Sequence, residues 1–266
     1  MSIPITWVDA FSPAPFGGNP AGVVLTDSAL PEETMQSIAF ELGIAETAFL
    51  LPGDDAHTFG LRWFSPQTEI DLCGHATLAA AHALRQGGTV DGTATLTFQT
   101  RSGPLRASFD GDLIVLDFPA EPLVPSDLPA SLEGQWPAGS VVHSSSTGFF
   151  RFVVVDRAAL VRHYEPDLAA IAAAGHKAVL LTAAADDDAA ADYVLRVFGP
   201  NVGIDEDPAT GSAQCSAGPY WAAVLGRSQL VAHQLSPRGA VLHVRPAGDR
   251  VHIGGAATTV LVGQLC

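Results

Sequence analysis

Two loops in the chain place acidic or imidazole side chains directly before apolar stretches that have helical periodicity. One loop runs from Asp71 to His75, and the other runs from Asp205 to Ser212. The first N–H groups of a helix have no partner within the helix, and the helix N-terminus carries a partial positive charge. Gly74 and Gly211 would let a ligand approach these groups closely. The pattern predicts a pocket for a small anion, a carboxylate in particular.

His75 and Asp207 are the side chains of these loops that are best suited to hold a substrate. At the positive end of a helix the pKa of His75 should fall, so that a neutral imidazole donates or accepts a hydrogen bond near pH 7. Asp207 directly precedes Pro208 and offers a carboxylate as an acceptor. The sequence leaves an alternative open for both residues, since either side chain can simply cap a helix, and a histidine can also belong to the core.

Glu46 is the one charged residue in the stretch Gly43–Leu51, which has the pattern of a strand entering the core. Burial removes the solvation of a carboxylate and suits it to general acid/base catalysis near neutral pH. We therefore predict that Glu46 is the group that moves a proton. A glutamate on an edge strand, facing solvent, is the alternative that the spacing leaves open.

Cys73 offers a different chemistry, because a thiol at a helix N-terminus can act as a thiolate base. A racemase that works with two bases needs a second base on the opposite face of its substrate. The second loop has Ala209 and Ser212 near its helix start, and Cys215 lies further along the helix. The sequence thus favours one carboxylic acid over a pair of thiols and keeps a racemase as an alternative.

Neither a cofactor nor a metal is indicated by the sequence. Lys177 is the only lysine and precedes an apolar run that is typical of a strand, so Schiff-base and pyridoxal phosphate chemistry are not expected. The chain has no glycine-rich phosphate-binding motif. His75 and His82 are seven residues apart, which is too far along one helix for joint metal ligation.

An internal repeat must position the two loops. Leu61–Pro66 matches Leu195–Pro200 at four of six positions, with an offset of 134 residues, almost half of the chain. The same offset places Glu46 on Leu180, inside an apolar run, so one copy has an acid that the other lacks. We infer that the two halves are duplicates of one unit, and that duplication brings the two loops to a shared cleft.

Each half has the pattern of a mixed α and β unit. Pro31–Leu42 is predicted as a helix that ends before a glycine. Ala76–Arg85 is apolar nearly all round, which is typical of a helix buried on every side. Its counterpart, Ser212–Leu225, contains Gly218 and Pro219, which we expect to kink it. The expected strands are Ala21–Thr26, Thr47–Leu51, Phe59–Phe64, Ala94–Thr100, Leu113–Phe118, Phe150–Val155, Ala178–Leu181, Tyr193–Phe198, Ala240–Arg245, Arg250–Ile253 and Thr258–Gly263.

These elements predict an α+β fold with two pseudo-symmetric domains, each a curved, mostly antiparallel sheet around a central buried helix. The first domain takes residues 1–120 and is completed by a C-terminal strand at 256–266. The second domain takes residues 121–255. The proline-rich stretch Pro119–Pro129 is the expected linker between them.

Composition narrows the class of protein. Of the 266 residues 47% are apolar and 15% are charged, so a substantial core is expected. A net charge of −15 disfavours nucleic-acid binding, which needs a surplus of Lys and Arg. Three cysteines without paired spacing, no signal-peptide pattern and no apolar run of about 18 residues predict a cytoplasmic protein that does not enter a membrane.

The motifs together resemble the PhzF-like family of phenazine biosynthesis. The resemblance rests on four segments in the same order, Gly18–Val24, Ala45–Phe49, Cys73–Thr77 and Asp205–Ala213. It implies the fold of diaminopimelate epimerase and usually a homodimer. Cys73 resembles the position of one epimerase cysteine, whereas Ala209 stands near the second, so the epimerase pair is broken in this chain.

The resemblance also implies roles for individual residues. In the best understood kind of member, an isomerase of trans-2,3-dihydro-3-hydroxyanthranilate, a glutamate moves a proton across the ring. The resemblance gives this role to Glu46, the holding and polarising of the substrate to His75 and Asp207, and the lining of the pocket to Gly74, Gly211 and Ser212.

We therefore expect a cofactor-independent isomerase of a small, carboxylate-bearing metabolite. Two alternatives stay open. One is an amino-acid racemase or epimerase that uses Cys73, and the other is a non-catalytic protein that binds a small molecule on the same scaffold.

Overall fold

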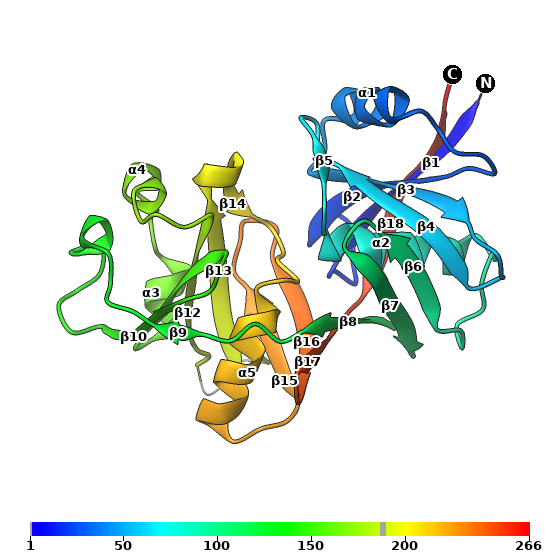
Figure 1. Ribbon diagram of the computed structural model, residues 1–266. Helices are drawn as coiled ribbons and strands as arrows, with labels where there is room; N and C mark the ends of the chain where they lie inside the picture. The colour runs from blue at the N-terminus through cyan, green and yellow to red at the C-terminus, as the bar shows by residue number, and fades with distance from the viewer. Residues whose placement is uncertain (1, 187–189) are drawn as a thin grey trace. The chain divides into compact units, whose positions relative to one another are not determined.

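The computed structural model describes residues 2–186 and 190–266, and the chain divides into two compact units (Figure 1). The first unit comprises Met1–Phe118 together with Ile253–Cys266, and the second comprises Pro119–His252. The fold is α+β, which confirms the predicted class. Within the described ranges, the helices are too short or too polar for any of them to cross a membrane.

In the first unit, a strongly curved sheet surrounds one helix. Its strands are β1 (Ile3–Ala10), β2 (Asn19–Leu25), β3 (Glu46–Pro52), β4 (Thr58–Phe64), β5 (Glu69–Ile70), β6 (Leu96–Thr100), β7 (Gly103–Asp110), β8 (Leu113–Pro119) and β18 (Ala257–Leu265), and its helices are α1 (Glu32–Leu42) and α2 (Gly74–Gln86). β2 runs parallel to β3 and β4 runs parallel to β6, whereas the other pairs are antiparallel. The last strand pairs along the first one, so the two termini lie side by side (Figure 1).

The two helices of the first unit lie on opposite faces of β3 and β4 (Figure 1). α2 contacts β1, β2, β3 and β18 and buries its alanine- and leucine-rich sides, so it is the central buried helix that the sequence predicts. α1 ends at Gly43 in the left-handed conformation, where glycine avoids a steric penalty. Its buried Met35, Ile38 and Ala39 pack against Phe49 and Phe64.

The second unit repeats this arrangement. Its strands are β9 (Val124–Pro125), β10 (Val141–Ser146), β11 (Phe150–Val155), β12 (Ala178–Ala184), β13 (Tyr193–Gly199), β14 (Ile204–Asp207), β15 (Leu230–Gln234), β16 (Ala240–Ala247) and β17 (Arg250–Gly255), and its helices are α3 (Ala158–Arg162), α4 (Leu168–Ala172) and α5 (Gln214–Leu225), with two short 3₁₀ turns at Ala130–Leu132 and Pro200–Val202. β11 runs parallel to β12, and β13 runs parallel to β15, as β2–β3 and β4–β6 do. The matching order of parallel and antiparallel pairs supports an internal duplication.

Strand register changes one detail of the repeat. Phe49 pairs with Arg62 in the first unit, and Leu181 pairs with Arg196 in the second. Glu46 lies three residues before Phe49, so its counterpart lies three residues before Leu181 and is Ala178. The constant offset that places Glu46 on Leu180 is therefore wrong, because the connection between these strands differs in length. The acid still has an apolar counterpart.

α5 runs without a break from Gln214 to Leu225 although Pro219 lies inside it. Proline has no N–H and leaves the carbonyl four residues earlier without its helical donor. That carbonyl, of Cys215, accepts a hydrogen bond from the backbone N–H of Glu121 at 2.9 Å. The stretch expected as the linker between the domains is packed against α5, and β9 within it pairs with β10.

Candidate active site

Glu46 and His75 form a buried acid–imidazole pair in the first unit. Glu46 is the first residue of β3 and is 9% exposed, while His75 is the second residue of α2 and is 7% exposed. The Glu46 Oε2 atom lies 2.9 Å from the His75 Nε2 atom. The alternative of a solvent-facing glutamate is therefore wrong. A carboxylate held next to an imidazole, with little water around it, is equipped to exchange protons with a bound molecule.

Asn19 holds the other side of the imidazole ring. Its Nδ2 atom lies 3.2 Å from Nδ1 of His75, and its side chain is fully buried. Rotation of the Asn19 amide exchanges its oxygen and nitrogen, so the amide can serve a neutral or a protonated ring. The family resemblance includes the segment around Asn19 but implies no role for this residue. A buried asparagine directly after two glycines was the signal that could have indicated it.

Gly18 allows Asn19 to reach this position. The backbone at Gly18 has φ +58°, and a Cβ atom there would lie 2.0 Å from the carbonyl oxygen of Ala10. Only glycine fits both the left-handed conformation and the close approach. The chain can then enter β2 at Asn19 with the amide directed at the histidine.

The pKa of His75 is raised, not lowered as the helix position predicted. Burial by itself would lower the pKa, but the Cys73 sulfur and the Glu46 carboxylate favour the protonated ring and outweigh burial, so the pKa lies well above its ordinary value. An opposite charge within ion-pair distance is a stronger influence than the partial charge of a helix end. The ring is therefore ready to donate a hydrogen bond.

Cys73 lies beside the pair but is a poor base. Its Sγ atom is 3.5 Å from Nδ1 of His75, and it occupies the position just before α2, with 5% exposure. Burial raises the pKa of the Cys73 thiol, which favours the neutral form over the thiolate. The residue just before α5 is Ala213, and burial raises the pKa of Cys215 to about 12.

The same three residues can also offer ligand atoms to a metal. One atom each from Glu46, Cys73 and His75 lies within 4.8 Å of the others. Spacing along one helix does not reveal this set, because Glu46 lies on β3 whereas Cys73 and His75 lie at the start of α2. A thiol, an imidazole and a carboxylate are a donor set that zinc accepts.

The start of α2 adds donors to this site. Within the described residues, no side chain makes a capping hydrogen bond at its N-terminus, so backbone N–H groups of its first turn can donate to an anion. Gly74, the first residue of the helix, is half-buried. These features support the predicted anion pocket in the first unit.

Asp207, Gly211 and Ser212 lie in the second unit. Asp207 ends β14, and its Oδ2 atom accepts a hydrogen bond from Thr210 Oγ1 at 2.5 Å. Gly211 and Ser212 form the turn before α5, where their carbonyls accept from Gln214 and Cys215 at 3.0 Å each. The bond from Thr210 agrees with a turn-stabilising role of the Asp207 carboxylate. The neighbouring Glu206 is paired with Arg196 at 2.7 Å.

A duplicated α+β unit with one central helix packed against each curved sheet defines the diaminopimelate epimerase-like fold, and comparison with known proteins agrees. The chain belongs to the family described as phenazine biosynthesis-like proteins (PhzC-PhzF), whose model matches residues 8–263. It is 41% identical over 269 residues to an uncharacterized isomerase of Pseudomonas aeruginosa, covering 100% of this chain and 99% of the relative.

Solved structures give the same result. A phenazine biosynthesis protein of the PhzF family from Enterococcus faecalis matches with a TM-score of 0.93 and 37% identity, covering 100% of both chains. A predicted epimerase from Pseudomonas aeruginosa matches with a TM-score of 0.73 and 28% identity, covering 99% of both chains. The family and the fold expected from the sequence motifs are confirmed.

Proposed function

We propose that this protein is a cofactor-independent isomerase that moves a proton between two carbon atoms of a small, carboxylate-bearing metabolite. The observation that carries the proposal is the buried contact between Glu46 Oε2 and His75 Nε2, 2.9 Å apart, at the uncapped start of α2. The names of relatives as isomerases support the reaction class.

In the proposed reaction Glu46 takes a proton from a carbon atom of the substrate and the carbon–hydrogen electron pair shifts into the adjacent unsaturated system. Glu46 then returns the proton to another carbon on the same face. His75 donates a hydrogen bond to the substrate atom on which negative charge develops. A single carboxyl group completes the cycle, so no second base is needed.

The substrate carboxylate would bind the free N–H groups at the start of α2, next to Gly74. Asp207, with backbone groups of Gly211 and Ser212, would hold the hydroxyl, amine or carbonyl group of the substrate. These three roles belong to the proposal and stay predictions. Replacement of Asp207 by Asn tests them through the KM of the substrate.

Proton exchange in D₂O tests the role of Glu46. The probe is trans-2,3-dihydro-3-hydroxyanthranilate, together with small carboxylates that co-purify with the protein. Glu46→Gln should keep the fold and ligand binding but lose exchange of the carbon-bound proton by about 10² to 10⁴ in rate. Glu133→Gln, at an exposed glutamate, is the matched control and should exchange like the unchanged protein.

The alternatives give other results. Full exchange in Glu46→Gln would overturn the assignment of Glu46. If a ligand binds both the unchanged protein and Glu46→Gln but exchanges its carbon-bound proton in neither, a non-catalytic binding protein is favoured. If Cys73→Ala loses as much proton exchange as is expected for Glu46→Gln, a racemase is favoured.

A further inference from the structure

A hollow of about 390 Å³ lies in the first unit, away from the Glu46–His75 pair. Side chains alternate between the two faces of a strand. Glu46 contacts α2, whereas Phe49, three positions later, packs against α1 on the other face. The hollow opens on this α1 face. Its lining consists of Thr26, Ala29, Leu30, Met35, Phe49, Leu50, Leu51, Gly60, Leu61, Arg62, Gln99, Thr100 and Arg101.

Gly60 lies at the floor of the hollow and leaves its space open, because it has no side chain. Gly60 pairs with Leu51 of β3 on one side and with Gln99 of β6 on the other. It carries no side chain, and an added Cβ would meet only Leu51, at 3.8 Å. By the register of the repeat, the counterpart of Gly60 is Val194, which is buried in the core that includes residues of α3 and α4. The second unit thus fills the place that the first unit leaves open.

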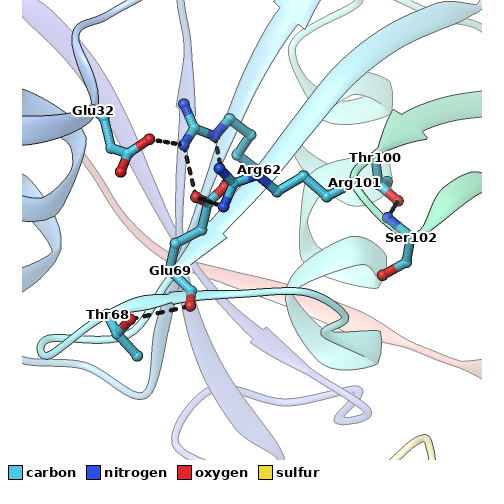
Figure 2. Close-up of polar contacts among 7 residues, drawn as sticks. All are labelled: Glu32, Arg62, Thr68, Glu69, Thr100, Arg101 and Ser102. Carbon is cyan, nitrogen blue, oxygen red and sulfur yellow. Dashed lines mark hydrogen bonds and ion pairs between the residues drawn. The ribbon is translucent and has the colours of Figure 1, made fainter.

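Arg62 stands at one edge of the hollow with part of its guanidinium unused. Nε and Nη2 donate to Glu69 at 2.6 and 2.7 Å, and Nη2 also donates to Glu32 (Figure 2). Arg101, whose side chain is 56% exposed, also pairs with Glu69. Among the described residues, Nη1 of Arg62 has no hydrogen-bond acceptor, and the side chain is 31% exposed.

The corresponding arginine of the second unit shows what this nitrogen is equipped to bind. Arg196 pairs with Glu206 through Nε and Nη2, as Arg62 pairs with Glu69. Its Nη1, however, donates to the carbonyl oxygen of Tyr164 at 2.6 Å, just beyond α3, and the side chain is 10% exposed. In the described part of the first unit, Nη1 of Arg62 has no such carbonyl partner, so a ligand oxygen can take the equivalent position.

We propose that the hollow is a second binding site, which takes a small amphipathic carboxylate. The apolar body of the ligand lies over Gly60 against Leu51, Phe49 and Met35. Its carboxylate accepts from Nη1 of Arg62 and from the exposed guanidinium of Arg101. Volumes of about 300 to 1,000 Å³ are usual for sites of small molecules, so the hollow suits such a ligand better than a folded partner.

The charge of Glu32 should affect the affinity of the hollow for a carboxylate. Its carboxylate, with a side chain that is 61% exposed, competes for Nη2 of Arg62 from the first turn of α1. Glu69 is held by two arginines and is nearly buried, so it stays in place. A bound carboxylate repels Glu32 at short range. Removal of the charge at Glu32 should therefore strengthen binding, which a purely apolar hollow would not show.

Isothermal titration calorimetry with 2-naphthoate and octanoate, at fixed ionic strength, tests the proposal. Both carboxylates should bind saturably, and their neutral carboxamides should bind about tenfold more weakly, since a charge-assisted hydrogen bond is lost. Glu32→Gln should tighten binding of the carboxylates, and Arg101→Gln should weaken it. Gly60→Leu should abolish it, because the new side chain occupies the hollow.

Each outcome decides the proposal. No saturable binding, equal affinity for carboxamides, or full binding by Gly60→Leu would overturn it. Gly60→Leu should keep the proton exchange that depends on Glu46, so a failure of the second site and a failure of the proposed function are distinguishable. Arg62→Lys keeps the charge but not the forked geometry and should bind more weakly. If that variant does not fold, Glu32→Gln and Arg101→Gln still decide.

Discussion

His75 Nε2 lies 2.9 Å from Glu46 Oε2, although the two residues are separated by β3, β4 and β5 in the chain. The contact joins the first residue of a strand to the first turn of the central helix. Both elements are anchored in the core of one unit, through Ala48 and Leu50 on β3 and through Leu78 and Ala79 on α2. A pair fixed in this way keeps its geometry without a substrate, which preorganises the site.

Asn19 should act as a positioning residue for this pair. Asn19→Ala removes the amide that meets Nδ1 of His75 at 3.2 Å, and the ring is then free to turn away from Glu46. We expect kcat to fall by about 10- to 100-fold, the range observed when the hydrogen-bond partner of a metal-ligating histidine is removed, while the KM changes little. Asn201→Ala, at an exposed asparagine of the second unit, is the control. A kcat within twofold of the unchanged protein would contradict the role of Asn19.

The central helices could be predicted because their composition is unusual. Ala76–Arg85 was expected and Gly74–Gln86 is observed, and Ser212–Leu225 was expected where α5 covers Gln214–Leu225. A helix with apolar residues on every side is expected to be buried, as α2 is, whereas Val224 near the end of α5 is 56% exposed. The short α3 and α4 were missed, since five residues are too few to show a helical period.

Several strands escaped prediction for a related reason. β1 has a proline, Pro4, as its second residue, and β7 has Arg106 and Asp110 at exposed positions. Neither forms an unbroken apolar run, and both become strands through pairing, β1 with β18 and β2 and β7 with β6 and β8. Tertiary pairing overrides weak local preference in sheets.

The site was predictable in its residue types but not in its details. Glu46 and His75 were both singled out as candidates because each stands where an apolar element begins, and both are buried, but the contact between them was not predicted. The raised pKa of His75 could not be predicted, since the sequence does not show that Glu46 and Cys73 flank the ring. The role of Asn19 also depends on a contact between residues 56 positions apart.

Gly18→Ala should damage both stability and activity. The backbone has φ +58°, and the new methyl group would overlap the Ala10 carbonyl, which a Cβ there approaches to 2.0 Å. We expect a loss of about 2 kcal/mol or more in unfolding free energy, measured in urea. Gly111→Ala is the matched control, because its φ is also +58° but nothing lies within 4 Å of its Cβ. Equal losses in both variants would show that the close approach at Gly18 does not matter.

Thiol chemistry should distinguish an acid-based isomerase from a racemase. Burial raises the pKa of Cys73 and of Cys215, whereas Cys266 is exposed. Iodoacetamide should therefore modify Cys266 first in the folded protein, as mass spectrometry would show. Cys73→Ala should keep activity within about tenfold, since the neutral thiol takes no proton from the substrate. Rapid modification of Cys73 with parallel loss of activity would contradict this expectation.

The protonation of His75 should make stability depend on pH. Although burial opposes it, Cys73 and Glu46 hold the pKa of His75 above its ordinary value. The folded protein then binds this proton more tightly than the unfolded chain does. The stabilisation is complete below about pH 6.5, the ordinary pKa, and is lost as the pH rises through the folded-state pKa.

Urea unfolding between pH 6 and pH 8 measures this effect. The free energy of unfolding should decline above pH 6.5 by up to about 1.4 kcal/mol per pH unit, relative to His75→Gln measured in parallel. Glu46→Gln should make the decline end at a lower pH and reduce its total size, because the folded-state pKa falls when the ring loses its nearest carboxylate. The range ends at pH 8 because the thiol of Cys73 begins to contribute near its own ordinary pKa of about 8.5. Identical pH profiles for the unchanged protein and His75→Gln would mean that folding does not shift the pKa of the ring, and a rise in stability between pH 6 and pH 6.5 would mean that the ring is neutral in the folded state, as the helix position alone predicts.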